Sequence, residues 1–359
     1  MKRILVVATR QIGDVLLTTP LIQAARTRWP HARIDVLGFA GTLGMLHGNP
    51  DLAELIESPA RLGWRGTVSL LRRLWRSYDL ALVTQPGDRA HLMAWAAGRQ
   101  RSGIIPEHGG SNWWKRALLT HVVVSAGDLG EVHVVAEKLA LLRPWVAAES
   151  RNESVAVPPA SPLPAEIQSQ LRAGFVVIHA PSMWPYKQWP MAHFRILARQ
   201  LLARGLQVVL TGGGAQRDRD CVGTLLDLAA APQLLAVAGR LEFNQLVTLF
   251  NQAALYIGPD TSVSHLAAAC GVPTLVIFGP TNPQRWAPWP NDKRESPVRW
   301  LRSAPSQTVG NVTLLQGSPS CVPCGRAGCE DHLQSRSDCL VSITPQRVLE
   351  QALRILGGG

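Results

Sequence analysis

The amino-acid sequence predicts an α/β protein with two doubly wound domains, each a mostly parallel sheet with helices on both faces. Short apolar stretches typical of buried strands alternate with helical stretches from the first residues onward. Residues 150–164, SRNESVAVPPASPLP, carry four prolines among small polar residues, and the alternation restarts after them. The length of 359 residues also suits two domains of about 150 to 180 residues each.

We therefore expect a first domain over residues 1–160, a second over 161–345, and a C-terminal helix and tail over 346–359. The first domain begins with an apolar strand at 4–8, a short polar loop and a helix over 15–28. Further strands are expected at 34–38, 80–84 and 121–125, and a helical stretch at 132–142.

The second domain repeats the same alternation of strands and helices. Its predicted strands lie at 175–179, 207–211, 254–258 and 274–278, and its predicted helices at 191–204, 243–251 and 262–269. Residues 282–320 are rich in Pro, Trp and Arg, which predicts a surface loop with one weak strand at 311–315. A final helix is expected over 344–356.

Composition narrows the class of partner. The 36 Lys and Arg residues exceed the 25 Asp and Glu residues, giving a net charge of +11. Such an excess favours an anionic partner: nucleic acid, a lipid head-group surface or a phosphorylated substrate. The basic residues are dispersed and form no recognisable nucleic-acid module, so no nucleic-acid partner is predicted. No apolar stretch approaches the roughly 20 residues of a membrane span, and the apolar start is too short for a signal peptide, so we expect a cytoplasmic protein.

Polar residues follow the predicted strands of the second domain. Asp260, Thr261 and Ser262 open the helix at 262–269, where free backbone N–H groups favour a phosphate. The same three residues are also common helix N-caps. Other strand ends supply Ser182 and Lys187, then the glycines Gly212, Gly213 and Gly214, then Gly279 and Thr281. Their alternative interpretations are a solvated lysine, a glycine turn and an ordinary turn. Because parallel strands end at one sheet edge, we expect a site there for a nucleotide diphosphate.

The first domain presents a different loop after its first strand. It holds one glycine, Gly13, and one carboxylate, Asp14, so it lacks the glycines that let backbone amides surround a phosphate. Asp14 is a candidate base, and alternatively the N-cap of the helix that follows. Cations that could hold an anionic acceptor, or simply form solvated faces, are Arg61, Arg65, Arg72, Arg73, Arg76, Arg99, Arg101, Lys115 and Arg116.

Two further patterns concern metals. Asp218-Arg219-Asp220 has the form of a metal-binding Asp-x-Asp but is flanked by arginines, and we interpret it as the solvated face of a helix. Four cysteines form a C-x2-C-x4-C-x9-C pattern: Cys321, Cys324, Cys329 and Cys339. A structural zinc site, a group of reduced thiols, and a disulfide or iron–sulfur site all remain open.

With these motifs assembled, the chain resembles the ADP-heptose:lipopolysaccharide heptosyltransferases of glycosyltransferase family 9, and most closely the heptosyltransferase III branch. The resemblance rests on ILVVATRQIGDVLLTTP, HAPSMWPYKQWP, LTGGG, GPDTSVSHLAAACGVPTLVIFGPTNP and the cysteine-bearing tail. It implies a GT-B fold of two Rossmann-like domains facing across a cleft. The first domain would bind the acceptor and the second the nucleotide sugar, with no cofactor required for catalysis.

The resemblance also implies roles for individual residues. Asp14 would be the general base and Lys187 would act on the departing diphosphate. Asp260 would bind the donor sugar or ribose, and Gln216 would lie near the adenosine ribose. The full donor-binding set would be Ser182, Lys187, Gly212, Gly213, Gln216, Asp260, Thr261, Ser262 and His265, and the acceptor-binding set Gly13, Arg61, Arg65, Lys115 and Arg116. Ser262 and Gln216 depart from the family pattern, where a glycine and an acid are usual.

The predicted function is therefore inverting transfer of a heptose or related sugar from an ADP-sugar to a hydroxyl of the lipopolysaccharide inner core. The partners would be the ADP-sugar and a phosphorylated, lipid-linked core oligosaccharide, with peripheral contact at the cytoplasmic face of the inner membrane. One alternative is a nucleotide-binding oxidoreductase, which the missing G-x-G-x-x-G disfavours. The other is a non-catalytic nucleotide-sugar-binding relative, which the presence of Asp14 and Lys187 disfavours.

Overall fold

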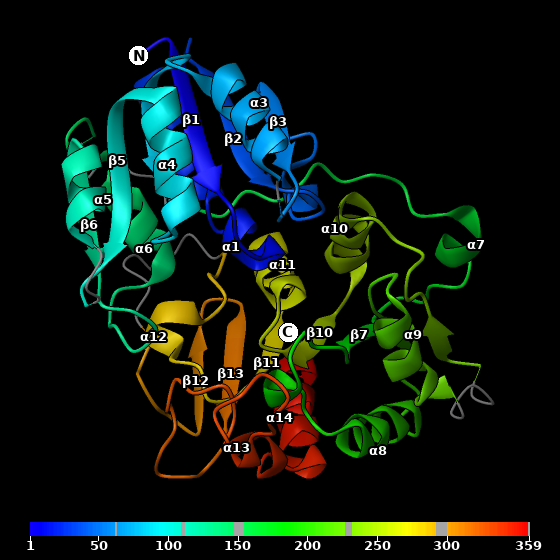
Figure 1. The fold of residues 1–359 in the computed structure, drawn as a ribbon. Helices are drawn as coiled ribbons and strands as arrows, with labels where there is room; N and C mark the ends of the chain where they lie inside the picture. Colours follow the sequence, from blue (N-terminus) through cyan, green and yellow to red (C-terminus); the bar gives the residue numbers. More distant parts are fainter. Residues whose placement is uncertain (62, 109–111, 147–153, 227–231, 292–299, 358–359) are drawn as a thin grey trace. The chain divides into compact units, whose positions relative to one another are not determined.

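The computed structural model describes residues 1–61, 63–108, 112–146, 154–226, 232–291 and 300–357. The chain separates into two compact units, Met1–Pro159 and Ala160–Gly359. In Figure 1 the first unit runs from blue to green and the second from green to red. Each unit is an α/β fold around one largely parallel sheet, which confirms the predicted fold class.

The first unit is built on a six-stranded sheet in the order β3-β2-β1-β4-β5-β6, and every pair of neighbours is parallel. This is the strand order of a Rossmann fold, in which the chain reverses direction across the sheet between β1 and β4. Ligands of such sheets bind at that reversal, beyond the carboxyl ends of the strands. The strands are β1 (Arg3–Ala8), β2 (Arg33–Phe39), β3 (Glu54–Ser58), β4 (Tyr78–Val83), β5 (Gly98–Pro106) and β6 (His121–Ser125).

Helices cover both faces of this sheet, as buried parallel strands require. On one face, Leu5, Val7 and Val83 pack against Leu74 of α3 and Met93 of α4, two helices that lie side by side in Figure 1. The helical elements of the unit are α1 (Ile12–Leu16), α2 (Thr19–Arg28), η1 (Gly44–Leu46), α3 (Trp64–Leu74), α4 (Asp88–Ala97), α5 (Asn112–Leu118), α6 (Val134–Leu139) and η2 (Ala140–Leu142).

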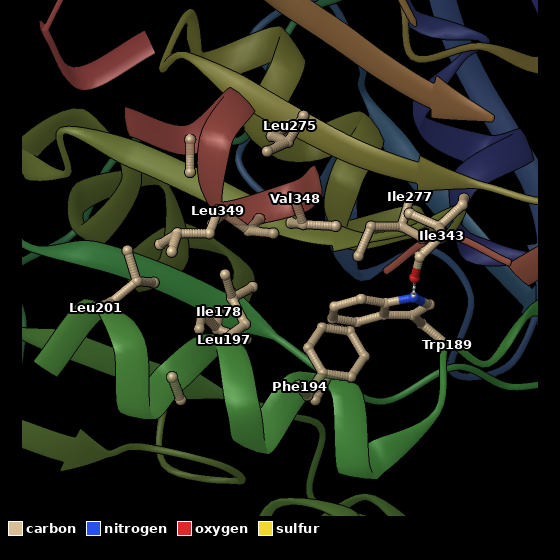
Figure 2. Packing of buried hydrophobic residues seen from close by; sticks show 14 of the residues in the cluster. Ile178, Trp189, Phe194, Leu197, Leu201, Leu275, Ile277, Ile343, Val348 and Leu349 are labelled. Carbon is tan, nitrogen blue, oxygen red and sulfur yellow. Dashed lines mark hydrogen bonds between the residues drawn. The ribbon is translucent and has the colours of Figure 1, made fainter. Parts of the chain in front are cut away.

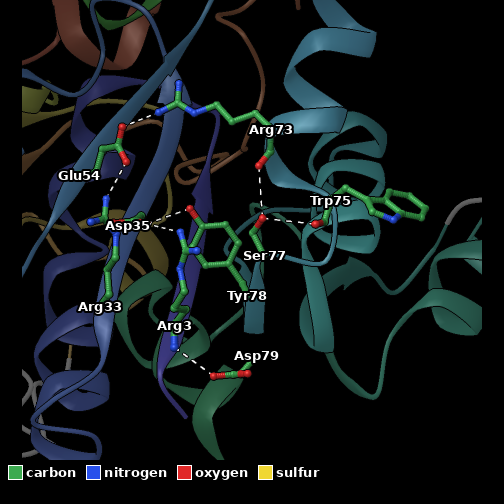
Figure 3. A network of polar contacts seen from close by, with 9 residues as sticks. All are labelled: Arg3, Arg33, Asp35, Glu54, Arg73, Trp75, Ser77, Tyr78 and Asp79. Carbon is green, nitrogen blue, oxygen red and sulfur yellow. Dashed lines mark hydrogen bonds and ion pairs between the residues drawn. The ribbon is translucent and has the colours of Figure 1, made fainter.

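A network of hydrogen bonds and ion pairs lies near the amino ends of β1 and β4 (Figure 3). The fully buried carboxylate of Asp35 accepts hydrogen bonds from the Tyr78 hydroxyl at 2.9 Å and from Arg33 at 3.1 Å. Burial raises the pKa of Tyr78, and the Asp35 carboxylate adds to the rise. The ion pair with Arg33 and the hydrogen bond from Tyr78 compensate the cost of burying the negative charge of Asp35.

The second unit has a seven-stranded sheet in the order β12-β13-β11-β10-β7-β8-β9. Six of its strands are parallel and repeat the Rossmann order, with the reversal between β7 and β10, while β12 pairs antiparallel with β13 at the edge. The strands are β7 (Val176–His179), β8 (Val208–Thr211), β9 (Leu234–Ala236), β10 (Leu255–Pro259), β11 (Thr274–Phe278), β12 (Ser306–Val309) and β13 (Val312–Gln316).

The core of the second unit is organised around Trp189 (Figure 2). Its ring is fully buried, contacts Phe194 edge to face, and donates a hydrogen bond from Nε1 to the Ile343 carbonyl at 2.9 Å. Val348 and Leu349 bring the C-terminal helix into the same core, against α8. The helical elements are α7 (Ala165–Gln168), η4 (Pro185–Lys187), α8 (Met191–Leu202), α9 (Gln216–Gly223), α10 (Phe243–Gln252), α11 (Ser262–Cys270), α12 (Pro283–Trp286), α13 (Asp338–Val341) and α14 (Pro345–Gly357).

Several element predictions were wrong or incomplete. The single helix expected over 15–28 is two helices, because the Thr18 and Thr19 hydroxyls bond back to the carbonyls of Val15 and Leu16 at the break. The stretch 132–142 begins only at Val134 and ends as a 3₁₀ turn. The weak strand at 311–315 is the fully buried β13, and the surrounding region also contains α12 and β12; residues 292–299 lie outside the described residues.

Candidate active site

An ion pair lies at the strand-order reversal of the second sheet. Lys187, in the short η4 turn that follows β7, places its Nζ 2.6 Å from Oδ2 of Asp260, directly after β10. Asp260 is buried, whereas the Lys187 side chain is 23% exposed. The pair therefore links the ends of β7 and β10, between which the strand order reverses. Its cation, Lys187, is accessible to a ligand.

The electrostatics of Asp260 depend on this pairing. Burial alone would raise the pKa of the Asp260 carboxyl, but Lys187, His265 and a hydrogen bond from Thr281 lower it below its usual value. Asp260 is therefore a carboxylate at neutral pH, and its ion pair holds the Lys187 ammonium group in position.

The helix start beside this pair is open. Thr261 occupies the N-cap position of α11, but within the described residues no side chain caps its first turn. The interpretation of Asp260, Thr261 and Ser262 as a capping run is therefore wrong: Asp260 pairs with Lys187 instead. His265 is buried in the next turn. The uncapped N–H groups and the helix dipole favour an anion at this point.

The loop that carries Lys187 is held by contacts that the sequence did not reveal. The Gln188 side chain accepts from the Ser182 N–H at 2.9 Å and donates to the Ala180 carbonyl at 2.8 Å. Ser337, far along the chain, donates its hydroxyl to the Tyr186 carbonyl at 2.6 Å. Trp189 anchors the end of the loop in the core. Ser182 is buried, and its hydroxyl donates to Trp184 within the same loop.

The glycine loop after β8 is also fixed by side chains. Asp218 accepts from the Gly213 N–H at 3.0 Å, and a Cβ on Gly212 would come within 3.3 Å of Pro181. Asp218 is thus half-buried and structural, so the interpretation of Asp218-Arg219-Asp220 as wholly solvated is wrong for its first residue. Gln216 is exposed and its amide donates to Asp220.

Arg217 is a further residue that the sequence did not single out. Its guanidinium donates to the carbonyls of Ser182 and Met183, which ties α9 to the loop after β7. The only sequence signal was its position beside the Asp-x-Asp, which does not distinguish a structural arginine from a solvated one.

Asp14 lies at the corresponding reversal of the first sheet, just after β1. It is the third residue of α1, whose N-cap position is occupied by Gln11, so the interpretation of Asp14 as the N-cap is wrong. The side chain is half-buried, and within the described part of the chain its carboxylate forms no hydrogen bond or ion pair. The carboxylate is thus not committed to a structural role there. Gly13 is buried within the same short helix.

The backbone of Asp14 is held by a lysine that the sequence did not identify. Lys138 of α6 is buried, and its Nζ donates to the Asp14 carbonyl at 2.6 Å. At the neighbouring strand end, the Gln85 amide donates to the Thr9 hydroxyl. Lys138 lies in an apolar helical stretch, where the sequence offers no sign of a long-range contact.

The predicted acceptor-binding cations differ in their surroundings. Arg61, Arg65 and Arg116 are exposed. Lys115 is not a solvated residue: it is buried, pairs with Asp88 at 2.6 Å and donates to the Pro86 carbonyl at 2.8 Å. Its charge is therefore partly neutralised, and it braces the loop that follows β4.

The four tail cysteines are free thiols in one neighbourhood. Burial, with a smaller contribution from Cys324, Cys329 and Cys321, raises the pKa of the Cys339 thiol to about 12. No group of three or more His, Cys, Asp or Glu side chains among the described residues is arranged to hold a metal ion. The segment instead supports the site, through Ser337 and through the Gly325 N–H, which donates to the Pro280 carbonyl at 2.9 Å.

In the described ranges, no helix is long and apolar enough to cross a membrane.

Residues 67–311 match the protein family described as Glycosyltransferase family 9 (heptosyltransferase). The Escherichia coli lipopolysaccharide heptosyltransferase 3 is 31% identical over 308 residues, which cover 80% of this chain and 88% of that protein. The solved E. coli ADP-heptose lipopolysaccharide heptosyltransferase II is 23% identical, with a TM-score of 0.72 over 100% of this chain and 99% of that one. E. coli heptosyltransferase WaaC, solved with ADP, is 15% identical, with a TM-score of 0.70 over 98% and 99%.

The fold is that of the GT-B glycosyltransferases, and the match to the family model shows that the chain is a glycosyltransferase. The chain belongs to glycosyltransferase family 9, the heptosyltransferase family.

His179, the last residue of β7, generates a testable pH dependence. Burial lowers its pKa to about 4, and its Nδ1 lies 3.0 Å from the Thr211 hydroxyl. Below the usual histidine pKa of about 6.5 the unfolded chain gains a proton that the folded chain does not. Stability should therefore fall as pH drops from about 6.5 to 4, by as much as roughly 3 kcal/mol from this group.

The His179→Asn variant should lose less stability than the native chain between pH 7 and pH 4.5, as measured by thermal unfolding. The matched His31→Asn variant changes an exposed histidine and should follow the native chain. Equal pH dependence of the native and His179→Asn chains would contradict the assignment.

Proposed function

We propose that the chain transfers a heptose from ADP-heptose to a hydroxyl of the lipopolysaccharide inner core, with inversion at the anomeric carbon. The observation that carries this proposal is the Lys187–Asp260 pair beside the uncapped start of α11, at the ligand-binding edge of the second sheet. The donor chemistry is supported by the ADP-heptose named for the solved E. coli heptosyltransferase II and the ADP named for the other solved relative.

The second unit is the proposed donor-binding unit. Lys187 and the N–H groups of Thr261 and Ser262 would face the diphosphate, because a cation and a helix start both stabilise negative charge. Ser182 would add a contact from the same loop as Lys187. Gly212 and Gly213 would allow close approach of the nucleoside. Asp260 and His265 would line the sugar side, and Gln216, exposed at the start of α9, would reach the ribose.

The first unit is the proposed acceptor-binding unit, with Asp14 as general base. The carboxylate would take the proton of the acceptor hydroxyl, whose oxygen then bonds to the anomeric carbon on the face opposite the diphosphate. The bond from that carbon to the diphosphate oxygen breaks, and its electron pair leaves with ADP. A diphosphate is a good leaving group, so no acid carboxylate is needed.

The acceptor would be a phosphorylated, lipid-linked core oligosaccharide. Arg61, Arg65 and Arg116 are exposed and would pair with its phosphates, and the loop of Gly13 would also contact the acceptor. Lys115 would contribute by bracing the loop after β4, since Asp88 already pairs with it. A lipid-linked acceptor places the enzyme in peripheral contact with the cytoplasmic face of the inner membrane.

Membership of a glycosyltransferase family removes the oxidoreductase alternative. A non-catalytic, nucleotide-sugar-binding relative is the second candidate, and the behaviour of Asp14 separates it from an enzyme.

The Asp14→Asn variant should lose transfer activity by roughly 10²- to 10⁴-fold, because the isosteric amide cannot accept the proton. Donor affinity, measured by calorimetry with ADP-heptose, should stay within about twofold since donor contacts lie in the other unit. Glu57→Gln, which removes an exposed acid from the same unit, should leave both values unchanged. Native turnover in the Asp14→Asn variant would remove Asp14 as the base.

The Lys187→Ala variant should raise the donor dissociation constant by roughly 10- to 100-fold, because a charge-assisted contact to the diphosphate is lost. This variant also leaves Asp260 buried without its cation. The Lys187→Met/Asp260→Asn double variant therefore serves as a second test, since it removes both charges together. A folded double variant with native donor affinity would contradict the diphosphate role.

We propose that catalysis uses no metal ion, because Lys187 and the start of α11 supply the positive charge that the leaving diphosphate requires. Transfer by the purified enzyme in excess EDTA should stay within about twofold of the untreated rate. A large loss that added Mg²⁺ or Mn²⁺ reverses would contradict this proposal.

A further inference from the structure

Two neighbouring helices of the first unit expose large apolar side chains. Trp64, Val68 and Trp75 lie on or directly after α3, and Leu92 and Trp95 lie on α4. Trp64 is 74% exposed, Trp75 54% and Trp95 39%. These five residues are called the tryptophan face below. Large apolar groups gathered in water commonly mark a surface that a partner covers.

The tryptophan face is one continuous surface. Positions 64, 68, 72 and 75 follow one stripe of a helix, and positions 92 and 95 follow another. The rings of Trp75 and Trp95 meet edge to face, with centroids 5.7 Å apart, and so join the two stripes. The core-facing side of α3 is formed by other residues, Leu70, Leu71 and Leu74. The exposed rings are therefore not needed to hold α3 against its sheet.

The surroundings of this face are strongly basic. Residues 59–76 contain five arginines and no acid. The guanidinium of Arg65 lies 5.2 Å from the Trp64 ring centre, and that of Arg76 lies 5.9 Å from the Trp75 ring centre. Arg72 lies on the apolar stripe itself. Arg73 differs because it pairs with Glu54 on the sheet side.

Nearby acids are already engaged. The Asp88 carboxylate, at the start of α4, pairs with Lys115. Asp79, which follows the loop of Trp75, accepts hydrogen bonds from the backbone N–H groups of Lys2 and Arg3, and its charge interacts with the N-terminal ammonium group and Arg99. The positive charge of the arginines around the tryptophans is thus not cancelled by these acids, and the face is complementary to an anionic surface.

The backbone holds the end of this face in place. Arg76 has a left-handed conformation, with φ of 50°, and its N–H donates to the Ala96 carbonyl of α4 at 2.8 Å. The Ser77 hydroxyl contacts the carbonyls of Arg73 and Trp75, as Figure 3 shows. The loop that presents Trp75 and Arg76 is therefore fixed to both helices.

We propose that the tryptophan face lies on an anionic lipid bilayer. Trp rings favour the head-group level of a membrane, where their apolar body and polar N–H are both satisfied. Arginines beside them pair with anionic head groups. A helix with aromatic residues and arginines on its outer side lies in the plane of the interface and does not span it. The inference rests on the proposed function only in that a lipid-linked acceptor brings the enzyme to a membrane.

The test is flotation of the full chain with vesicles of phosphatidylethanolamine and phosphatidylglycerol, compared with phosphatidylcholine alone, without donor or acceptor. The native chain should float with the anionic vesicles and only weakly with the neutral ones. Trp64→Ser/Trp75→Ser should reduce the association at least tenfold. Arg72→Gln/Arg76→Gln should reduce it by roughly tenfold or more at low salt.

Matched controls change exposed residues of the second unit. Leu301→Ser/Leu333→Ser removes exposed apolar side chains, and Arg199→Gln/Arg204→Gln removes two exposed arginines. Both controls should float like the native chain. The tryptophan variant and both controls should transfer sugar to a delipidated, soluble core oligosaccharide at the native rate, so failure of the native chain in that assay counts against the proposed function alone.

Three outcomes would overturn the inference. One is a native chain that binds neither vesicle or binds both equally. Another is native flotation by the tryptophan and arginine variants. The third is a loss of self-association by these variants in sedimentation velocity with flotation unchanged, which would make the face an interface between copies of this chain.

Discussion

The ion pair between Lys187 and Asp260 is the contact on which the second unit's site depends. A buried carboxylate is costly unless it is paired, and here the partner comes from the loop after the neighbouring strand, β7. The pair links the ends of β7 and β10, the two neighbouring strands between which the strand order reverses. It also leaves a fixed, partly exposed cation beside an uncapped helix start. Trp189 and Ser337 keep the lysine loop in place, so the core and the cysteine-bearing tail both serve this contact.

The first unit uses a buried cation in a different way. Lys138 donates to the backbone carbonyl of Asp14, not to its carboxylate. This contact holds the backbone of Asp14 and leaves its carboxylate without a bonded partner among the described residues. Asp260 differs, because its carboxylate forms an ion pair with Lys187. The edge of the first sheet thus carries the carboxylate of Asp14, and the edge of the second sheet carries the ammonium group of Lys187, fixed by Asp260. This division matches what glycosyl transfer from a nucleotide sugar requires: a base on one side and charge stabilisation on the other.

Much of the fold and some of the site could be predicted from local sequence. Apolar runs such as 4–8 and 274–278 are strong strand signals because both faces of a parallel sheet are buried. β5 was not predicted, since GRQRSGIIP begins with polar residues, and β9 has only three residues. The roles of Lys115 and Asp218 were misjudged because a lysine or aspartate in isolation reads as solvated. Their partners, Asp88 and the Gly213 N–H, become visible only when the chain is folded.

The sequence by itself determined the α/β class, the alternation of elements in two halves, and the polar residues that follow each strand, because these depend on local periodicity and on residue type. It also carried the motifs that resemble the family. Only the tertiary structure decided which of these polar residues meet. The order of strands brings Asp260 to Lys187 across 73 positions, and the packing of α6 brings Lys138 to Asp14 across 124. Such contacts are set by topology and burial, which no local pattern encodes.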